Sequence, residues 1–89
     1  MATISGKVTG IDGRPAWNAT LVFSPLDGRG ASRFGLAGED GQFTIDGLVP
    51  GNYRVKVNQR YYMLFSFNMD VIGDEDRVLI ELEPDPQAR

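Results

Sequence analysis

Few residues in this 89-residue chain are of the types that carry out chemistry. The chain has no histidine and no cysteine, so it lacks the commonest general base at neutral pH, any disulfide and any thiolate metal site. Serines, aspartates and two lysines, Lys7 and Lys56, are present, but without histidine they cannot form a conventional nucleophile and base pair. We therefore predict that the protein is not an enzyme and has no catalytic residues.

Two acidic turns are the candidates for a metal site. Glu39 and Asp40 precede a glycine, and Asp74, Glu75 and Asp76 form a cluster ahead of the last strand-like segment. Carboxylate oxygens of either group could hold calcium, but neither has the D-x-D-x-D-G spacing of a calcium loop. We interpret both as solvated turn tips, and we predict neither a metal nor a cofactor.

The single tryptophan offers a binding surface instead. Trp17 lies beside Pro15 in a turn rather than on a strand. It could be a lid over one end of the domain, or it could be an exposed platform on which a sugar ring stacks. With Tyr61 and Tyr62 it would form a carbohydrate-binding surface, which is the alternative function that we consider.

Turn signals recur along the chain at short intervals. Asp-Gly pairs begin at Asp12, Asp27, Asp40 and Asp46, and such pairs favour turns because glycine accepts positive φ and aspartate bonds its own backbone. The stretches between them alternate apolar and polar residues, as half-buried strands do. The pattern predicts an all-β domain with seven strands, near residues 3–11, 19–24, 32–37, 42–46, 53–58, 61–71 and 77–83.

The apolar face of these strands is the predicted core. On the first strand Ile4, Gly6 and Val8 face inward, while Ser5, Lys7 and Thr9 face outward. The large side chains of the predicted core are Val8, Leu21, Phe23, Phe43, Ile45, Tyr53, Val55, Val57, Phe65, Ile80 and Leu82.

The segment 61–71 departs from the pattern, because both of its faces begin apolar. One interpretation places Phe65, Phe67 and Met69 in the core, with the preceding side chains covering a sheet end or the base of a loop. The other is a docking surface, since exposed aromatic side chains are enriched at protein interfaces. The candidate partner surface consists of Tyr61, Tyr62 and Leu64.

The turn and core residues form one continuous set of motifs: Gly6 and Val8, Gly13-x-Pro15, Ala19-x-Leu21-x-Phe23, Asp40-Gly41-x-Phe43-x-Ile45 and Leu48-x-Pro50-Gly51-x-Tyr53-x-Val55-x-Val57. Together these motifs resemble a known family, the carboxypeptidase regulatory-like domain, which belongs to the transthyretin-like or prealbumin-like sandwiches. That resemblance implies a seven-stranded Greek-key β-sandwich that serves as an accessory module.

Related adhesin repeats of the B type form an isopeptide bond between lysine and asparagine, catalysed by a buried acid. This chain has Val57 where those repeats place the glutamate, and Lys7 falls on the outward side of its strand. The resemblance therefore does not extend to a self-crosslink.

Composition narrows the partners. The net charge of −3 and pI near 4.7 are opposite to the basic footprint of a nucleic-acid binder. No signal peptide and no membrane-spanning run is seen in the sequence, so we predict no membrane insertion.

We predict one β-sandwich domain over residues 1–83 and a flexible tail or linker stub over residues 84–89. Its predicted function is that of a non-catalytic accessory or interaction module, excised from or part of a larger secreted or cell-envelope protein. The partner would be a neighbouring domain or another copy of the chain.

Overall fold

The computed structural model describes residues 1–28 and 30–86, and this part of the chain is built from strands and turns. The bounds agree with the predicted strands within a few residues, except where noted below. The strands are β1 (Ala2–Gly10), β2 (Thr20–Pro25), β3 (Arg33–Leu36), β4 (Gln42–Leu48), β5 (Gly51–Asn58), β6 (Phe65–Val71) and β7 (Glu75–Leu82).

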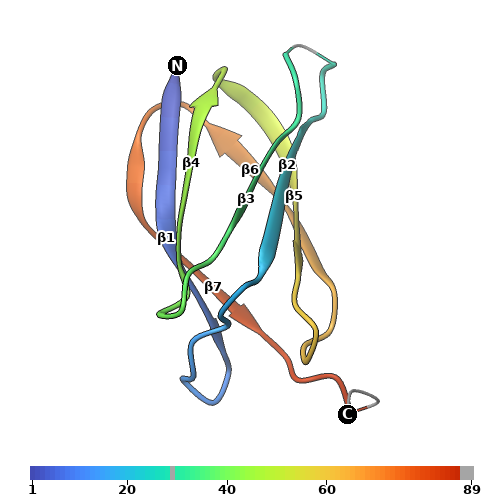
Figure 1. Ribbon diagram of the computed structural model, residues 1–89. Coiled ribbons are helices and arrows are strands. Elements are labelled where there is room, and N and C mark those ends of the chain that lie inside the picture. The colour runs from blue at the N-terminus through green and yellow to red at the C-terminus, as the bar shows by residue number, and fades with distance from the viewer. Residues whose placement is uncertain (29, 87–89) are drawn as a thin grey trace.

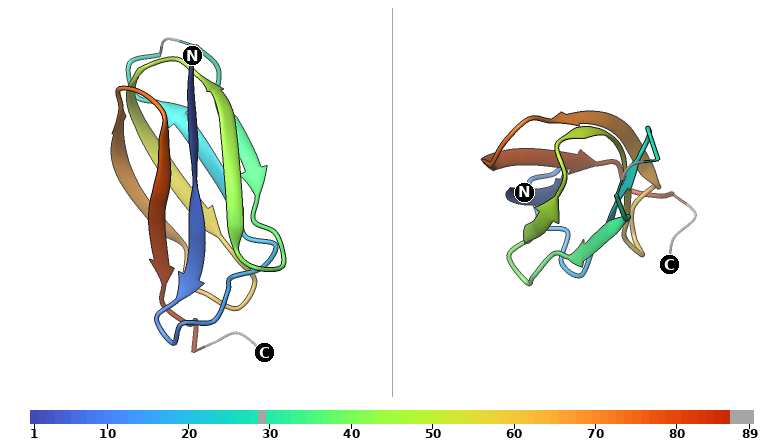
Figure 2. Two further views of the ribbon diagram at one scale, coloured as in Figure 1. Left: turned by 90° about the vertical axis from the view of Figure 1, so that its left-hand side faces the viewer. Right: turned by 90° about the horizontal axis from the view of Figure 1, so that it is seen from above.

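The seven strands form two sheets that pack face to face (Figures 1 and 2). One sheet has the order β4-β1-β7 and the other the order β3-β2-β5-β6. β1 pairs with β7 in parallel, whereas the other ladders are antiparallel. The predicted seven-stranded all-β sandwich is confirmed.

The core lies between the sheets and consists mainly of the predicted inward side chains. Phe43 and Ile45 on β4, and Tyr53, Val55 and Val57 on β5, are buried while the residues between them are exposed. This alternation follows from the two-residue repeat of a strand with one buried face. The core also contains Ile4, which lies on the predicted inward face of the first strand, and further small and branched side chains: Ala2, Ala16, Ala19, Ala37, Leu48 and Val71.

The hydroxyl of the buried Tyr53 has a hydrogen-bond partner. The Tyr53 hydroxyl donates a hydrogen bond of 2.5 Å to the carbonyl oxygen of Val49. Its ring meets the ring of Phe23 edge-on, with centroids 6.2 Å apart. A buried tyrosine is tolerated because its hydroxyl has a partner.

The placement of Phe65 in the core is wrong. Its side chain is 40% exposed, and Phe67 and Met69 on the same face are only partly buried. β6 is an edge strand of its sheet, and Phe65 and Phe67 line an open hollow with Leu79 and Ile80 of β7 instead of packing into the closed core. The strand also begins at Phe65 instead of residue 61, because residues 61–64 form a turn and a short bridge.

The two long flanks of the sandwich differ. On one flank β3 lies against β4, where Gly35 faces the side chain of Ile45 and the guanidinium of Arg33 lies over Gly47. On the other flank β6 and β7 run along the same side as the outer strands of their sheets (Figure 2). Here an apolar hollow remains between them, which we call the flank groove, lined by Met63, Leu64, Phe65, Phe67, Leu79, Ile80, Glu81 and Glu83.

Thr9 corrects a second expectation. It was predicted to face outward, but it is 9% exposed. The turn after β1 folds back over it, and Pro15 forms an isolated bridge with Thr9. The linker between β1 and β2 therefore covers the end of β1, which places Trp17 beside the end of the sandwich.

Candidate functional site

A cleft at one end of the sandwich brings together the aromatic residues that the sequence singled out. It has a volume of about 430 Å³. Trp17, Tyr61 and Tyr62 all line it, although they lie in different parts of the sequence. We call it the aromatic cleft, and its lining residues are Asp12, Arg14, Pro15, Trp17, Glu39, Gln59, Tyr61 and Tyr62.

Three linkers meet at this end. The linker after β1 carries Trp17, the linker before β4 carries Glu39, and the turn after β5 carries Tyr61 and Tyr62. These linkers lie at the end of the molecule opposite the N-terminus (Figure 1). The direction of the strands therefore decides which side chains share the cleft.

Gln59 holds two of these linkers together, and the sequence analysis did not identify it. Its Nε2 donates to the carbonyl oxygen of Trp17 at 3.1 Å, and its Oε1 accepts from the amide of Tyr61 at 2.6 Å. The side chain is buried, with 7% exposure. The sequence does indicate that Gln59 faces inward, because it continues the two-residue repeat of the inward-facing Tyr53, Val55 and Val57.

The turn that carries Tyr61 and Tyr62 is fixed by backbone bonds as well. The amide of Tyr62 donates to the carbonyl of Gln59 at 3.1 Å, and the amide of Met63 donates to the carbonyl of Glu83 at 2.8 Å. The amide of Asp85 donates in turn to the carbonyl of Tyr61 at 3.0 Å. Backbone hydrogen bonds thus fix the turn that carries these aromatic side chains.

The same contacts concern the predicted tail, residues 84–89. Pro84 forms an isolated bridge with Tyr62, and Asp85 bonds Tyr61 as stated above. The chain is therefore bonded to the domain as far as Asp85. The last part of the predicted tail, residues 87–89, lies outside the described residues.

Charged groups surround the aromatic rings of the cleft. Asp12 and Arg14 form an exposed ion pair at 3.8 Å, and Asp12 also accepts the Arg14 amide at 3.1 Å. Arg60 lies over the ring of Tyr61, with its guanidinium carbon 5.4 Å from the centroid, which favours a cation–π contact. Aromatic faces next to carboxylate and guanidinium groups can bind a polar ring or an extended backbone, and the described lining offers no nucleophile with an adjacent base.

The structure divides the candidate partner surface. Tyr61, which is exposed, and Tyr62, which is half-buried, line the aromatic cleft, whereas the exposed Leu64 lines the flank groove. Trp17 is 52% exposed, so its ring is at the surface of the cleft and is not buried as a lid would be. The sugar-platform interpretation of Trp17 thus has the exposure that it requires.

The acidic turns have structural roles. Asp40 accepts the amide of Gln42 at 3.0 Å within its own turn. Asp74 accepts the amide of Thr3 at 2.8 Å and so ties the β6–β7 connection to the start of β1. Among the described residues, no three acidic side chains gather where they could hold a metal ion.

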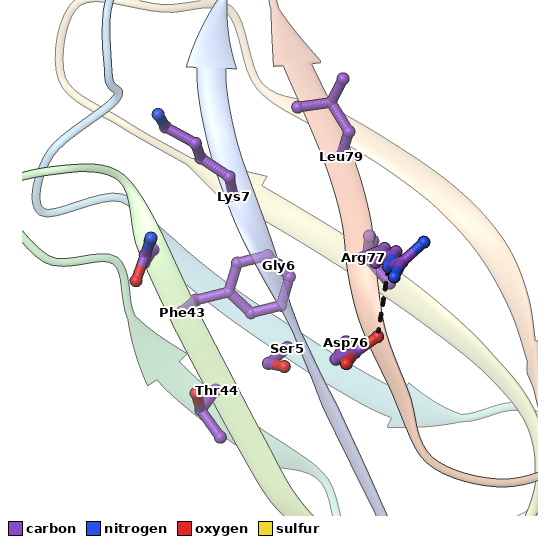
Figure 3. Close-up of a pocket in the computed structure, with 10 residues that line it drawn as sticks. Ser5, Gly6, Lys7, Phe43, Thr44, Asp76, Arg77 and Leu79 are labelled. Atoms are coloured by element: carbon purple, nitrogen blue, oxygen red, sulfur yellow. Dashed lines mark ion pairs between the residues drawn. The ribbon is translucent and has the colours of Figure 1, made fainter.

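A further hollow of about 370 Å³ lies on the outer face of the three-stranded sheet, over Gly6 (Figure 3). The β1–β7 register shifts beside this hollow, between Ile4 and Gly6. Lys7 and Leu79 extend from the strands on either side, and an exposed ion pair at 4.0 Å joins Arg77 to Asp76. Lys7 faces outward as predicted, far from the buried Val57.

The sequence profile of the carboxypeptidase regulatory-like domain matches residues 3–83. The chain belongs to this family. The match reaches from β1 to β7 and includes all the residues that line the aromatic cleft and the flank groove. No curated protein matches the chain.

Solved structures of similar fold share little sequence with this carboxypeptidase regulatory-like domain. A chain of a mutant type II cohesin–X-dockerin complex from Acetivibrio cellulolyticus superposes with a TM-score of 0.75 at 18% identity, over 92% of this chain and 57% of that one. A DUF3823 family protein from Bacteroides ovatus gives 0.68 at 18% identity, over 94% and 46%. The 5-hydroxyisourate hydrolase of Klebsiella pneumoniae gives 0.65 at 19% identity, over 93% and 87%.

These likenesses show the transthyretin-like sandwich fold. At such identities they carry no site residues over to this chain. This chain spans 57% and 46% of the cohesin-complex and DUF3823 chains, so each of those chains includes a substantial part with no counterpart here. Within the described residues, no helix is long and apolar enough to cross a membrane.

Proposed function

We propose that this domain is a non-catalytic interaction module of a larger secreted or cell-envelope protein, and that Tyr61, Tyr62 and Leu64 form its contact surface. The observation that supports this is the turn between β5 and β6. It presents exposed aromatic and aliphatic side chains on a backbone that is hydrogen bonded to Gln59, Glu83 and Asp85.

Such a surface binds at low entropic cost. Tyrosine has few rotatable bonds, and each ordered side chain otherwise costs about 0.5 to 1.5 kcal/mol on association. A backbone already fixed in the free domain adds to this preorganisation. The likeness to a chain of a cohesin–X-dockerin complex, which is an assembly of protein modules, supports the same class of function.

The absence of native cysteine provides a clean test. Tyr61→Cys places one thiol in the turn, and Thr44→Cys places a control thiol on the exposed outer face of β4. Each variant is labelled with a thiol reagent in dilute solution, first as the isolated domain and then within the complete gene product. We expect labelling at position 61 to slow by about tenfold or more in the complete protein, with position 44 unchanged. Equal rates in both contexts, or a complete gene product consisting of this domain alone, would contradict the proposal.

The aromatic cleft supports carbohydrate binding as a second candidate function. Trp17 and Tyr61 expose ring surface in one cleft with Asp12, Arg14 and Glu39, and sugars stack on aromatic faces while carboxylate and guanidinium groups bind their hydroxyls. Titration with maltohexaose should quench or shift the emission of Trp17, and Trp17→Ala should abolish binding measured by calorimetry. Calorimetric titration with maltohexaose and with cellohexaose up to about 10 mM would detect binding of millimolar affinity. If neither sugar releases or absorbs heat over that range, carbohydrate binding is excluded as a function of the cleft.

A further inference from the structure

Among the described residues, exposed apolar side chains outside the aromatic cleft include two groups that lie at opposite edges of the four-stranded sheet. The flank groove follows β6 at one edge. At the other edge β3 exposes Phe34 and Leu36, at 77% and 61%. Soluble domains seldom leave large apolar side chains this exposed in groups unless something covers them.

The flank groove is apolar with an acidic border. Its two adjoining hollows have volumes of about 410 and 210 Å³ and share Phe65 and Glu81. Leu79 is 62% exposed beside them. The only charged residues among the described lining are Glu81 and Glu83, so a partner of this groove should carry apolar side chains and positive charge.

The second surface has these properties. Gly35 faces the core side chain of Ile45, so the residues on either side of it, Phe34 and Leu36, point away from the core. Strand pairing then sets Phe34 beside Val22, and Val22 beside Lys56, in one row across the sheet.

The next outward position on β5 carries a second cation, Arg54, which lies opposite Ser24. We call this surface the basic face; it consists of Val22, Phe34, Leu36, Arg54 and Lys56.

We propose that the flank groove of one copy binds the basic face of a second copy. Phe34 and Leu36 would pack against Phe65 and Leu79, and the cations of β5 would approach the carboxylates of β7. This inference rests on the proposed function, because it takes the domain to be an interaction module and names a partner for one of its surfaces.

Charge favours this pairing over a symmetric one. Two flank grooves placed face to face would bring Glu81 and Glu83 of both copies together, and like charges across an interface cost binding energy. Groove against basic face sets opposite charges together instead. The contact is therefore heterologous, with different surfaces of the two copies meeting.

The strand order makes this association open-ended. Phe34 and Leu36 on β3 lie three strand positions from β6 in the order β3-β2-β5-β6, or roughly 14 Å at about 4.8 Å per strand, whereas the cations of the basic face lie on β5, the strand next to β6. Binding at one edge leaves the other edge free, and heterologous contacts that do not close into a ring continue as a chain.

The expected affinity is modest. The contact would bury only a few apolar side chains, and each aromatic one contributes a buried area of about 150 to 250 Å². The interface is therefore near the lower size limit of stable complexes. A dissociation constant on the order of 10 μM to 1 mM is typical of such contacts.

Two variants, each damaging one surface, test the inference. Phe34→Glu disables the basic face, and Leu79→Lys disables the flank groove; both side chains are exposed, so the fold should survive, as checked by circular dichroism and thermal unfolding. Sedimentation equilibrium at rising concentration should show the wild type associating beyond a dimer. Each variant alone should associate about tenfold more weakly or stay monomeric.

The equimolar mixture of the two variants is decisive. Phe34→Glu retains the groove and Leu79→Lys retains the basic face, so the mixture should form a dimer and stop there. Added salt at about 0.5 M should weaken the dimer, because the facing charges are partly exposed. Thr44→Lys, on the outer face of the other sheet, is the control and should associate like the wild type.

Three outcomes would overturn the inference: a wild type that stays monomeric up to about 1 mM, a mixture that remains monomeric, or a control variant that loses association. None of these would affect the proposed function, which the labelling of position 61 tests in dilute solution. Conversely, the labelling of position 61 could be equal in the isolated domain and the complete gene product while the wild type still associates. That result would contradict the proposed function and leave the pairing of the two copies supported.

Discussion

The contribution of core burial to stability can be measured by comparing two phenylalanines, one buried and one exposed. Phe43 on β4 is 3% exposed, whereas Phe34 on the neighbouring β3 is 77% exposed. The same truncation to alanine removes the same atoms at both sites. The difference between the two variants therefore reports burial with little contribution from strand propensity.

We expect Phe43→Ala to lower the free energy of unfolding by about 3 to 5 kcal/mol, from lost transfer energy and the cavity left behind. A domain of 89 residues has a total stability of about 4 to 13 kcal/mol, so this loss is a large share. Phe34→Ala should change stability by less than about 0.5 kcal/mol, as is usual for surface positions.

Urea unfolding followed by circular dichroism provides the measurement. With a denaturant slope of about 1 kcal/mol per M, the Phe43→Ala midpoint should fall by about 3 M or more, and the Phe34→Ala midpoint by less than about 0.5 M. If Phe43→Ala does not fold, Phe43→Leu should still fold with a loss below about 1.5 kcal/mol. A loss below about 1 kcal/mol for Phe43→Ala would refute the inward register of β4, and a loss above about 2 kcal/mol for Phe34→Ala would refute the exposure of β3.

Three further substitutions or measurements follow from the geometry. Gly6→Ala should lower the free energy of unfolding in urea by about 3 kcal/mol or more, because the added Cβ would overlap the backbone carbonyl of Val78 in the centre of a sheet. The control Gly73→Ala, whose Cβ would meet nothing within 4 Å, should be nearly neutral. Equal losses of stability in the two variants would contradict the close approach at Gly6. Trp17 should emit near the maximum of free tryptophan and be quenched readily by acrylamide, since half of its ring is exposed; a strongly blue-shifted maximum would mean a buried ring. Gln59→Leu should cost about 1 to 3 kcal/mol and raise the quenching of Trp17, because it removes the hydrogen bond to the Trp17 carbonyl; unchanged quenching would show that the linker is held by other contacts.

Strands with one buried face and one solvent-exposed face could be predicted from sequence. β5 alternates in this way from Asn52 to Asn58, and β4 does so from Gln42 to Asp46. The correct placement of Phe43, Tyr53 and Val55 follows from this pattern. It depends only on local order along the strand.

The two edge strands of the four-stranded sheet, β3 and β6, could not be predicted in the same way. Phe65 is apolar and in phase with its strand, yet it is exposed because β6 has no neighbour on its outer side and no bonded strand opposite. Phe34 and Leu36 are likewise in phase with each other but face outward, since Gly35 takes the inward position over Ile45. Periodicity gives the phase of a strand, whereas pairing decides which phase is buried.

The aromatic cleft depends on both kinds of information. Its tryptophan and tyrosines could be recognised as candidates from their types, but their meeting depends on which linkers share one end of the sandwich. Gln59 is the residue that connects the two levels. It keeps the inward phase of β5 one step past the end of the strand, and its side-chain amide bonds the linker of Trp17 and the turn of Tyr61. An inward-phase polar residue just beyond a buried strand therefore indicates that two loops are joined there, and in this domain the joined loops carry the exposed rings of the cleft.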